Sequence, residues 1–334
     1  SISGLTKGTA YYQLPTVGVT YSDTNADTSS VTAVLVGRKG NVFKPAVSGG
    51  YLELSEIPDE AKYDDLYTLT IKGTDLAGND QTASVEFILN RYGSNVDVTG
   101  TNYQGRYLQA PVDVDLEETT VEALNEDKTD IKVTLDGAPY PVAPALQSTT
   151  RTGGDAGDYV YAYHIDKAAF QKEGTYLIQV VSQTEGGLDQ VSRLSYSFVV
   201  DSTNPELQVS GIRTDAAYRS ESRDFTVTPR DMTTVTLEAQ VDGKPMQLLS
   251  DENGIYTGTL PQSTSAHTVV LKATDMAGNV TETTISDVYV NASTFGQVIN
   301  WIRHHVLATS AAGGILAAAA ALIVWARRRK SADN

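Results

Sequence analysis

Short runs of alternating apolar and polar residues fill the first 291 positions of the chain. Turn residues interrupt these runs at intervals of about 8–12 positions, as in β-sandwiches. Alternation with a period of two places one side of each strand in a core and the other side in solvent. The pattern therefore predicts an all-β fold and argues against units in which strands alternate with helices.

The same order of runs occurs three times, which indicates a repeated domain. Polar and turn residues separate the repeats near Arg91–Ser94 and at Asp201–Pro205. We predict three tandem immunoglobulin-like β-sandwiches at residues 1–92, 93–200 and 201–291, each of the usual size for that fold. The runs are 31–36, 51–54, 67–74 and 84–89 in the first unit, 131–135, 159–165, 176–181 and 194–200 in the second, and 235–241, 255–260, 268–274 and 283–290 in the third.

A nearly identical phrase ends the first and third units: LTIKGTDLAGNDQT at 69–82 and LKATDMAGNVTET at 271–283. Both versions read as strand, tight turn and strand, so we predict a hairpin between the last two strands. The aspartate can accept backbone N–H groups, and the glycine and asparagine tolerate positive φ. The predicted structural turn residues are Asp75, Gly78, Asn79, Asp275, Gly278 and Asn279. In the second unit the corner becomes Thr184-Glu185-Gly186-Gly187.

Tyr67 and Tyr176 occupy equivalent positions at the start of the strand before that turn. This placement predicts a tyrosine corner, in which the ring hydroxyl bonds to backbone nearby. His267 replaces the tyrosine in the third unit, where the prediction is in doubt.

Residues 306–326 form an uncharged apolar segment that differs from everything before it. At about 1.5 Å per residue, a helix of this length covers the ~30 Å hydrocarbon layer of a bilayer. We predict a transmembrane helix there, preceded by a juxtamembrane stem at 292–305. The small-residue spacing of Ser310 and Gly314 would also allow two such helices to dimerise, although alanine-rich spans contain such spacings by chance.

Four basic residues follow the predicted span directly and act as its membrane stop: Arg327, Arg328, Arg329 and Lys330. The positive-inside rule then places residues 327–334 in the cytoplasm as a basic tail and the preceding domains outside. We expect a single-pass protein of the cell membrane whose partner is the lipid bilayer. The chain starts at Ser1 without the charged and apolar regions of a signal peptide. We therefore expect a processed chain or the C-terminal piece of a longer one.

Composition removes several kinds of chemistry. The chain has no cysteine, so it forms neither disulfides nor cysteine-ligated zinc sites. A net charge of −16 argues against nucleic acid as a partner. The four histidines lack zinc-site spacing, and there is no nucleophile elbow or phosphate-binding glycine loop. We therefore predict no catalytic residues, no cofactor and no metal.

Calcium is the alternative considered for the repeated turns. One aspartate and one asparagine fall short of the six to eight oxygens that calcium takes, so a structural turn is preferred for Asp75 and Asp275. The other acidic candidates are Asp113, Asp115, Glu117 and Glu118, or Asp23 and Asp27. We interpret the DVDLEE group as a solvated strand edge, where charge discourages pairing with other chains.

Two further features leave alternatives open. Lys7 and Asn90 could form an isopeptide bond between the first and last strands, with loss of ammonia. Tyr159, Tyr161 and Tyr163 lie on one face of a predicted strand. They fill a core if that face is internal, or stack on sugars if it is external.

Several phrases resemble the bacterial immunoglobulin-like repeats of Gram-positive surface proteins. They are the Asp-x-x-x-Pro opening at 201–205, Val-Asp-Gly at 241–243, Thr-Asp-Met-Ala-Gly-Asn at 274–279 and the joins at 87–96 and 107–124. The resemblance covers residues 1–291 and implies a non-catalytic extracellular stalk that presents a more N-terminal region. The alternatives are an adhesin for a host protein or glycan, and the anchoring end of a surface hydrolase with an upstream catalytic domain.

Overall fold

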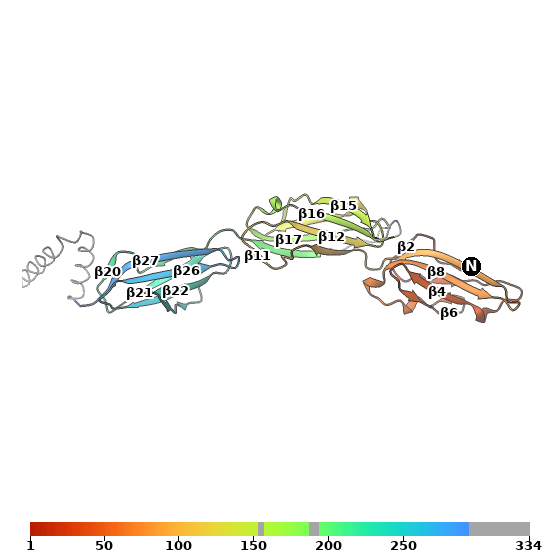
Figure 1. The fold of residues 1–334 in the computed structure, drawn as a ribbon, viewed down its shortest axis with the longest axis horizontal. Coiled ribbons are helices and arrows are strands. Elements are labelled where there is room, and N and C mark those ends of the chain that lie inside the picture. The colour runs from red at the N-terminus through yellow and green to blue at the C-terminus, as the bar shows by residue number, and fades with distance from the viewer. Residues whose placement is uncertain (153–156, 187–193, 294–334) are drawn as a thin grey trace, which may run out of the picture. The chain divides into compact units, whose positions relative to one another are not determined.

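A computed structural model describes residues 1–152, 157–186 and 194–293 of the 334-residue protein (Figure 1). The described residues form β-strands and short 3-10 helices, so the all-β prediction is confirmed. The predicted span at 306–326, the basic residues from Arg327 to Lys330 and most of the predicted stem lie outside the described residues. Within the ranges given above, no helix combines the length and the apolar character needed to cross a bilayer.

The first sandwich packs a four-stranded sheet, β1-β3-β7-β6, against a five-stranded sheet, β2-β9-β8-β4-β5. Its elements are β1 (Ile2–Ser3), β2 (Ala10–Tyr11), β3 (Val17–Val19), η1 (Thr28–Ser30), β4 (Thr32–Gly37), β5 (Val42–Phe43), β6 (Val47–Ser48), β7 (Tyr51–Leu52), η2 (Leu54–Glu56), η3 (Ala61–Tyr63), β8 (Asp65–Thr74) and β9 (Asp80–Leu89).

The second sandwich contains the sheets β10-β12-β16-β15 and β11-β18-β17-β13-β14. Its elements are β10 (Asn95–Thr99), β11 (Tyr107–Leu108), β12 (Val114–Thr120), η4 (Glu126–Lys128), β13 (Asp130–Leu135), β14 (Ala138–Tyr140), β15 (Ala145–Arg151), β16 (Tyr159–Ile165), η5 (Lys167–Phe170), β17 (Gly174–Val181) and β18 (Leu194–Val200).

The third sandwich contains the sheets β19-β21-β25-β24 and β20-β27-β26-β22-β23. Its strands are β19 (Glu206–Ser210), β20 (Ala216–Tyr218), β21 (Ser222–Arg230), β22 (Thr236–Val241), β23 (Lys244–Met246), β24 (Leu249–Ser250), β25 (Tyr256–Pro261), β26 (His267–Thr274) and β27 (Val280–Val290).

All three sandwiches share one strand order. The first strand of each pairs with the third in the four-stranded sheet, and the second joins the edge of the five-stranded sheet next to the ninth. That edge pairing is parallel for β2 with β9 and for β20 with β27, whereas the other pairings given for these two sandwiches are antiparallel. The six sheets therefore indicate three repeated sandwiches, while the domain boundaries at single-residue precision stay predictions.

Alternation along the strands produces the cores. In β8, Tyr67, Leu69 and Ile71 are buried, and the residues between them are partly exposed. Phe87 and Leu89 of β9 pack into the same cluster. Each fully buried large side chain contributes about 1.5–3 kcal/mol, so these faces fix which side of each strand turns inward.

The strand β12 corrects one sequence interpretation. The prediction that the DVDLEE group lies at a sheet edge is wrong, because β12 pairs with β10 on one side and β16 on the other. Its inward positions include Leu116 and also Glu118, which is fully buried. The run of acidic residues suggested that the whole strand is exposed to solvent. In the structure one face of the strand is buried, and exposed charge lies only on the outer face.

The chain divides into two compact units. The first comprises residues 1–106 and 110–200, and the second comprises residues 107–109 and the chain from Asp201 onward. Apart from β11, the first two sandwiches thus belong to one unit. The residues that join them are described next.

A polar junction between the first two sandwiches as candidate functional site

The connection between β9 and β10 is short and its polar side chains are buried. Asn90 has no exposed surface, and Ser94 is almost fully buried. The Asn90 side-chain carbonyl accepts the Gly93 amide at 2.9 Å, and its amide Nδ2 donates to Glu122 at 3.2 Å. The Ser94 and Ser182 hydroxyls lie 3.1 Å apart. The joining segment is therefore held by the second sandwich through hydrogen bonds.

Glu122, which follows β12, is the centre of this group. Its Oε2 accepts from Asn90, and its Oε1 accepts the Gly186 amide at 2.6 Å and lies 3.4 Å from the Tyr12 hydroxyl. A Cβ atom on Gly186 would overlap both Glu122 Oε1 and the Tyr12 hydroxyl, so any larger residue there would displace these two side chains. Glu122 is 8% exposed and links residues from both sandwiches without forming an ion pair in the described residues.

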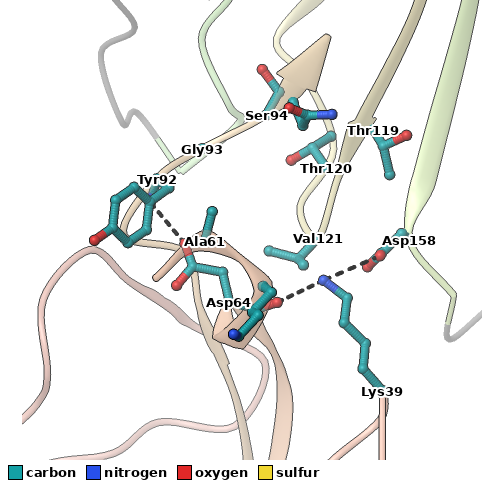
Figure 2. Close-up of a pocket in the computed structure, with 12 residues that line it drawn as sticks. Lys39, Ala61, Asp64, Tyr92, Gly93, Ser94, Thr119, Thr120, Val121 and Asp158 are labelled. Atoms are coloured by element: carbon teal, nitrogen blue, oxygen red, sulfur yellow. Dashed lines mark hydrogen bonds and ion pairs between the residues drawn. The ribbon is translucent and has the colours of Figure 1, made fainter. Parts of the chain in front are cut away.

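A second set of contacts is ionic. Asp158, just before β16, forms an ion pair with the Arg38 guanidinium and lies 3.4 Å from Lys39 Nζ. The same Lys39 ammonium donates to the Asp64 carbonyl at 2.7 Å, as Figure 2 shows. Asp158 thus forms ion pairs with two basic residues of the first sandwich. Pairs this well enclosed fix geometry more than they add stability, because desolvation offsets their attraction.

Asp64 and Asp65 accept hydrogen bonds from the basic residues and from the backbone beside them. Asp64 accepts the Arg91 Nε at 3.0 Å and the Tyr92 amide at 2.7 Å, and Asp65 accepts the Lys39 amide at 2.7 Å. Burial raises the pKa of both carboxyls, although the amides and nearby guanidinium groups act in the opposite direction. Their role is to orient the Arg38–Lys39 turn and the joining segment.

These residues surround a cavity of about 510 Å³. Figure 2 shows Lys39 and Asp158 on one side, Asp64 and Tyr92 on another, and the end of β12 across from them. The full lining is Lys39, Ala61, Lys62, Asp64, Tyr92, Gly93, Ser94, Asn95, Thr119, Thr120, Val121 and Asp158. Lys39, Asp64 and Asp158 are all engaged by other protein groups, so the lining offers polar contacts for a small molecule but no nucleophile paired with a base.

The sequence did not point to Glu122 or Asp158. Both are single acidic residues in an acidic chain, and their partners lie far from them in the sequence. The only available signal was the polar composition of the 87–96 join.

The predicted turn residues lie in hairpins. Asp75 accepts the Asn79 amide at 2.7 Å and its side-chain amide at 2.7 Å, and Asp275 accepts the same two groups of Asn279 at 2.8 Å. The corner glycines Gly78 and Gly278 have φ of 88° and 93°. In the first sandwich this turn contacts solvent, whereas in the third Asp275 and Asn279 are buried.

The two predicted tyrosine-corner residues make the same bond. Tyr67 donates to the Tyr63 carbonyl at 2.8 Å, and Tyr176 donates to the Lys172 carbonyl at 2.7 Å. Burial raises the pKa of Tyr176 to about 12, which keeps its hydroxyl a donor. In the third sandwich, His267 lies 2.9 Å from the Pro261 carbonyl oxygen through Nε2 instead.

The cation candidates from the sequence are held by local bonds. Asp23 accepts the Asn25 amide at 2.7 Å and Asp27 accepts the Ser29 amide at 3.0 Å, so each closes its own turn. The DVDLEE residues do not converge, because Glu118 faces the core while Asp113 and Asp115 face outward.

The remaining alternatives are also resolved by position. Lys7 is 81% exposed and pairs with Glu86 at 3.9 Å, whereas Asn90 is buried and bonded to Glu122, so the structure does not bring Lys7 and Asn90 together.

Tyr161 and Ile165, on the same face of β16, are buried in the sandwich. Tyr161 therefore faces the core, while Tyr159 and Tyr163 are partly buried.

Comparison with solved structures finds matches at low sequence identity. The fibronectin(III)-like modules of Clostridium thermocellum CbhA are 15% identical, with a TM-score of 0.28, covering 59% of this chain and 94% of that one. A tetra-tandem repeat from the extending region of a large adhesion protein is 19% identical, with a TM-score of 0.31, covering 81% and 69%. Bacteroides ovatus SGBP-B in complex with a mixed-linkage heptasaccharide is 16% identical, with a TM-score of 0.19, covering 78% and 60%.

No curated protein matches the chain. The profile of the bacterial Ig-like domain matches residues 4–91 and 171–291, which together exceed half of the 334 residues. The matched ranges contain the first sandwich, the end of the second and the third, including both copies of the repeated turn. The chain therefore belongs to the bacterial Ig-like domain family.

Proposed function

We propose that this protein is a non-catalytic, membrane-anchored extracellular stalk of a Gram-positive surface protein, which holds a more N-terminal region away from the membrane. The observation that carries the proposal is the repetition of one strand order three times, with the first two copies joined by buried hydrogen bonds at Asn90 and Glu122. Hydrogen-bonded sandwiches joined in this way resist extension, and an acidic surface keeps neighbouring molecules apart. The anchor in this proposal is the segment 306–326.

The test uses the full chain expressed behind a secretion signal in a Gram-positive host, with an epitope tag before Ser1. We expect the tag to react with antibody on intact cells, and the chain to stay in membranes washed with alkaline carbonate. A variant ending at residue 305 is the matched control and should appear in the medium. A tag accessible only after lysis, or full-length chain released by carbonate, would contradict the proposal.

An adhesin that binds a host glycan or protein is the second candidate, and the cavity at the junction favours it. Its lining combines hydroxyl, amide and charged groups around about 510 Å³. Glycan-array binding that is lost in Thr119→Arg, which fills the cavity from the end of β12, would support the adhesin. Binding at background level by the unmodified chain would exclude glycan recognition.

A further inference from the structure

Three aspartates gather at the end of the third sandwich where the chain enters it. Asp201 precedes β19, Asp231 directly follows β21, and Asp275 directly follows β26. One carboxylate oxygen of each lies within 4.8 Å of the other two. The sequence indicates only Asp275 as a candidate calcium ligand, because only the fold brings the three loops together.

Burying these carboxylates costs free energy, because they have too few hydrogen-bond donors. Asp201 has no exposed surface, and Asp275 is 7% exposed. The Thr233 hydroxyl lies 3.0 Å from both Asp201 Oδ2 and Asp231 Oδ1, and its single proton can serve only one of them fully. Asp201 Oδ1 is buried and accepts no hydrogen bond from any described residue. A buried carboxylate oxygen without a donor needs another positive partner.

No basic side chain supplies that partner. Among the described residues, no lysine, arginine or histidine forms an ion pair with Asp201, Asp231 or Asp275. Burial raises the pKa of Asp201, and the carboxylates of Asp231 and Asp275 raise it further. The three groups therefore repel one another unless a proton or a cation intervenes.

We propose that Asp201, Asp231 and Asp275 bind a calcium ion. All the donors are oxygens, which hard divalent cations prefer to nitrogen or sulfur. Calcium accepts six to eight oxygens in irregular geometry, including hydroxyl groups and water, and so suits ligands carried on three separate loops. Asn279 acts as a positioning residue, because its amide donates to Asp275 Oδ2 at 2.8 Å and to the Asp201 carbonyl at 2.7 Å.

The first sandwich offers a matched comparison. Asp75 occupies the same turn as Asp275 and makes the same bonds to its asparagine, but it is only partly buried and joins no such carboxylate group within the described ranges. In the other acidic group, Asp113 and Asp166 are exposed and His164 is partly buried. Neither aspartate has a buried carboxylate oxygen without a hydrogen-bond donor, which is what distinguishes Asp201. Asp75→Asn and Asp113→Asn are therefore controls that remove a carboxylate but leave the proposed site unchanged.

The experiment titrates calcium chloride into the metal-stripped full chain in mild detergent and follows both heat and hydrogen exchange. We expect one calcium ion per chain and slower exchange of the amides around Asp201, Asp231 and Asp275. Asp231→Asn and Asp201→Asn should each weaken binding by at least about tenfold, since affinity follows ligand charge. Both control variants should bind as the unmodified chain does.

Exchange in the unmodified chain tests the site without any substitution, so misfolding of a variant does not remove the test. No heat and no protection at millimolar calcium would overturn the proposal. Protection confined to the loops around Asp113 and His164, or binding that survives both Asp201→Asn and Asp231→Asn, would overturn it as well.

Discussion

Glu122 holds its buried charge with neutral donors. Backbone and side-chain N–H groups from Gly186 and Asn90 point at its two oxygens, and Tyr12 lies at the limit of hydrogen-bond distance. Such an arrangement avoids the desolvation of a second charge, but it makes each donor depend on the carboxylate. The residue therefore matters to the junction more than its single contacts suggest.

Glu122→Ala should loosen the junction. The Asn90 and Gly186 donors would lose a charged acceptor, which lowers the free energy of local opening by about 3 kcal/mol. Native-state hydrogen exchange of the Gly93 and Gly186 amides measures this opening directly. Glu117→Ala, on the outer face of the same strand region, is the control and should change it by less than about 0.5 kcal/mol. Equal exchange in both variants would show that Glu122 does not hold the junction.

The pair His164–Asp115 predicts a pH dependence in the second sandwich. Nδ1 of His164 lies 2.7 Å from Asp115 Oδ1, and this bond raises the pKa of the imidazole above its ordinary value. Because the folded pKa is the higher one, the pair stabilises the fold fully below about pH 6.5, the ordinary value for histidine, and the stabilisation is lost as pH rises through the folded pKa. NMR titration should show the midpoint falling in Asp115→Asn and staying constant in Asp130→Asn, an exposed position in the opposite sheet. An unchanged midpoint in Asp115→Asn would contradict the assignment.

At the scale of elements, the hairpin turns combine side-chain and backbone requirements. Gly78 has φ of 88°, and a Cβ atom there would meet nothing within 4 Å. Its replacement thus isolates backbone strain from packing. Gly278 has the same conformation, but a Cβ atom added there would lie 3.5 Å from Gln109 Nε2. Its replacement would therefore combine backbone strain with a change in packing.

Gly78→Ala should lower the stability of the first sandwich by about 1–2 kcal/mol, the cost of the left-handed region for a residue with a Cβ. Gly78→Asn should cost less, because asparagine tolerates that region. Calorimetry of the full chain compares the two through the first sandwich's transition. Equal losses for both substitutions would mean that backbone conformation is not the cause.

The long strands and their turns were predictable because alternation and the Asp-x-x-Gly-Asn phrase are local signals. The runs at 67–74 and 84–89 lie within β8 and β9, for example. Two-residue strands such as β1 and β5 carry too little pattern to be recognised, and β12 was misjudged because its acidic residues mask a buried face. The Glu122 junction and the Asp201 group depend on contacts between distant segments, which no local pattern encodes.

At the scale of the whole molecule, one repeated sandwich accounts for the fold and is the basis of the proposed stalk. The first and third sandwiches each have a hydrophobic core of their own. Under the proposed function, each core would bear load independently. The junction at Glu122 joins two of these cores through buried polar bonds rather than a flexible linker. The proposed stalk needs these properties.

In the proposed stalk, the sandwiches are separate folded units that resist extension. Pulling the full chain between its two ends by single-molecule force spectroscopy tests this claim most directly. We predict three unfolding events, each releasing roughly 300–370 Å of chain, since roughly 90–110 residues extend at about 3.4 Å per residue. Extension to full length without resistance, or with fewer than three events, would contradict the account.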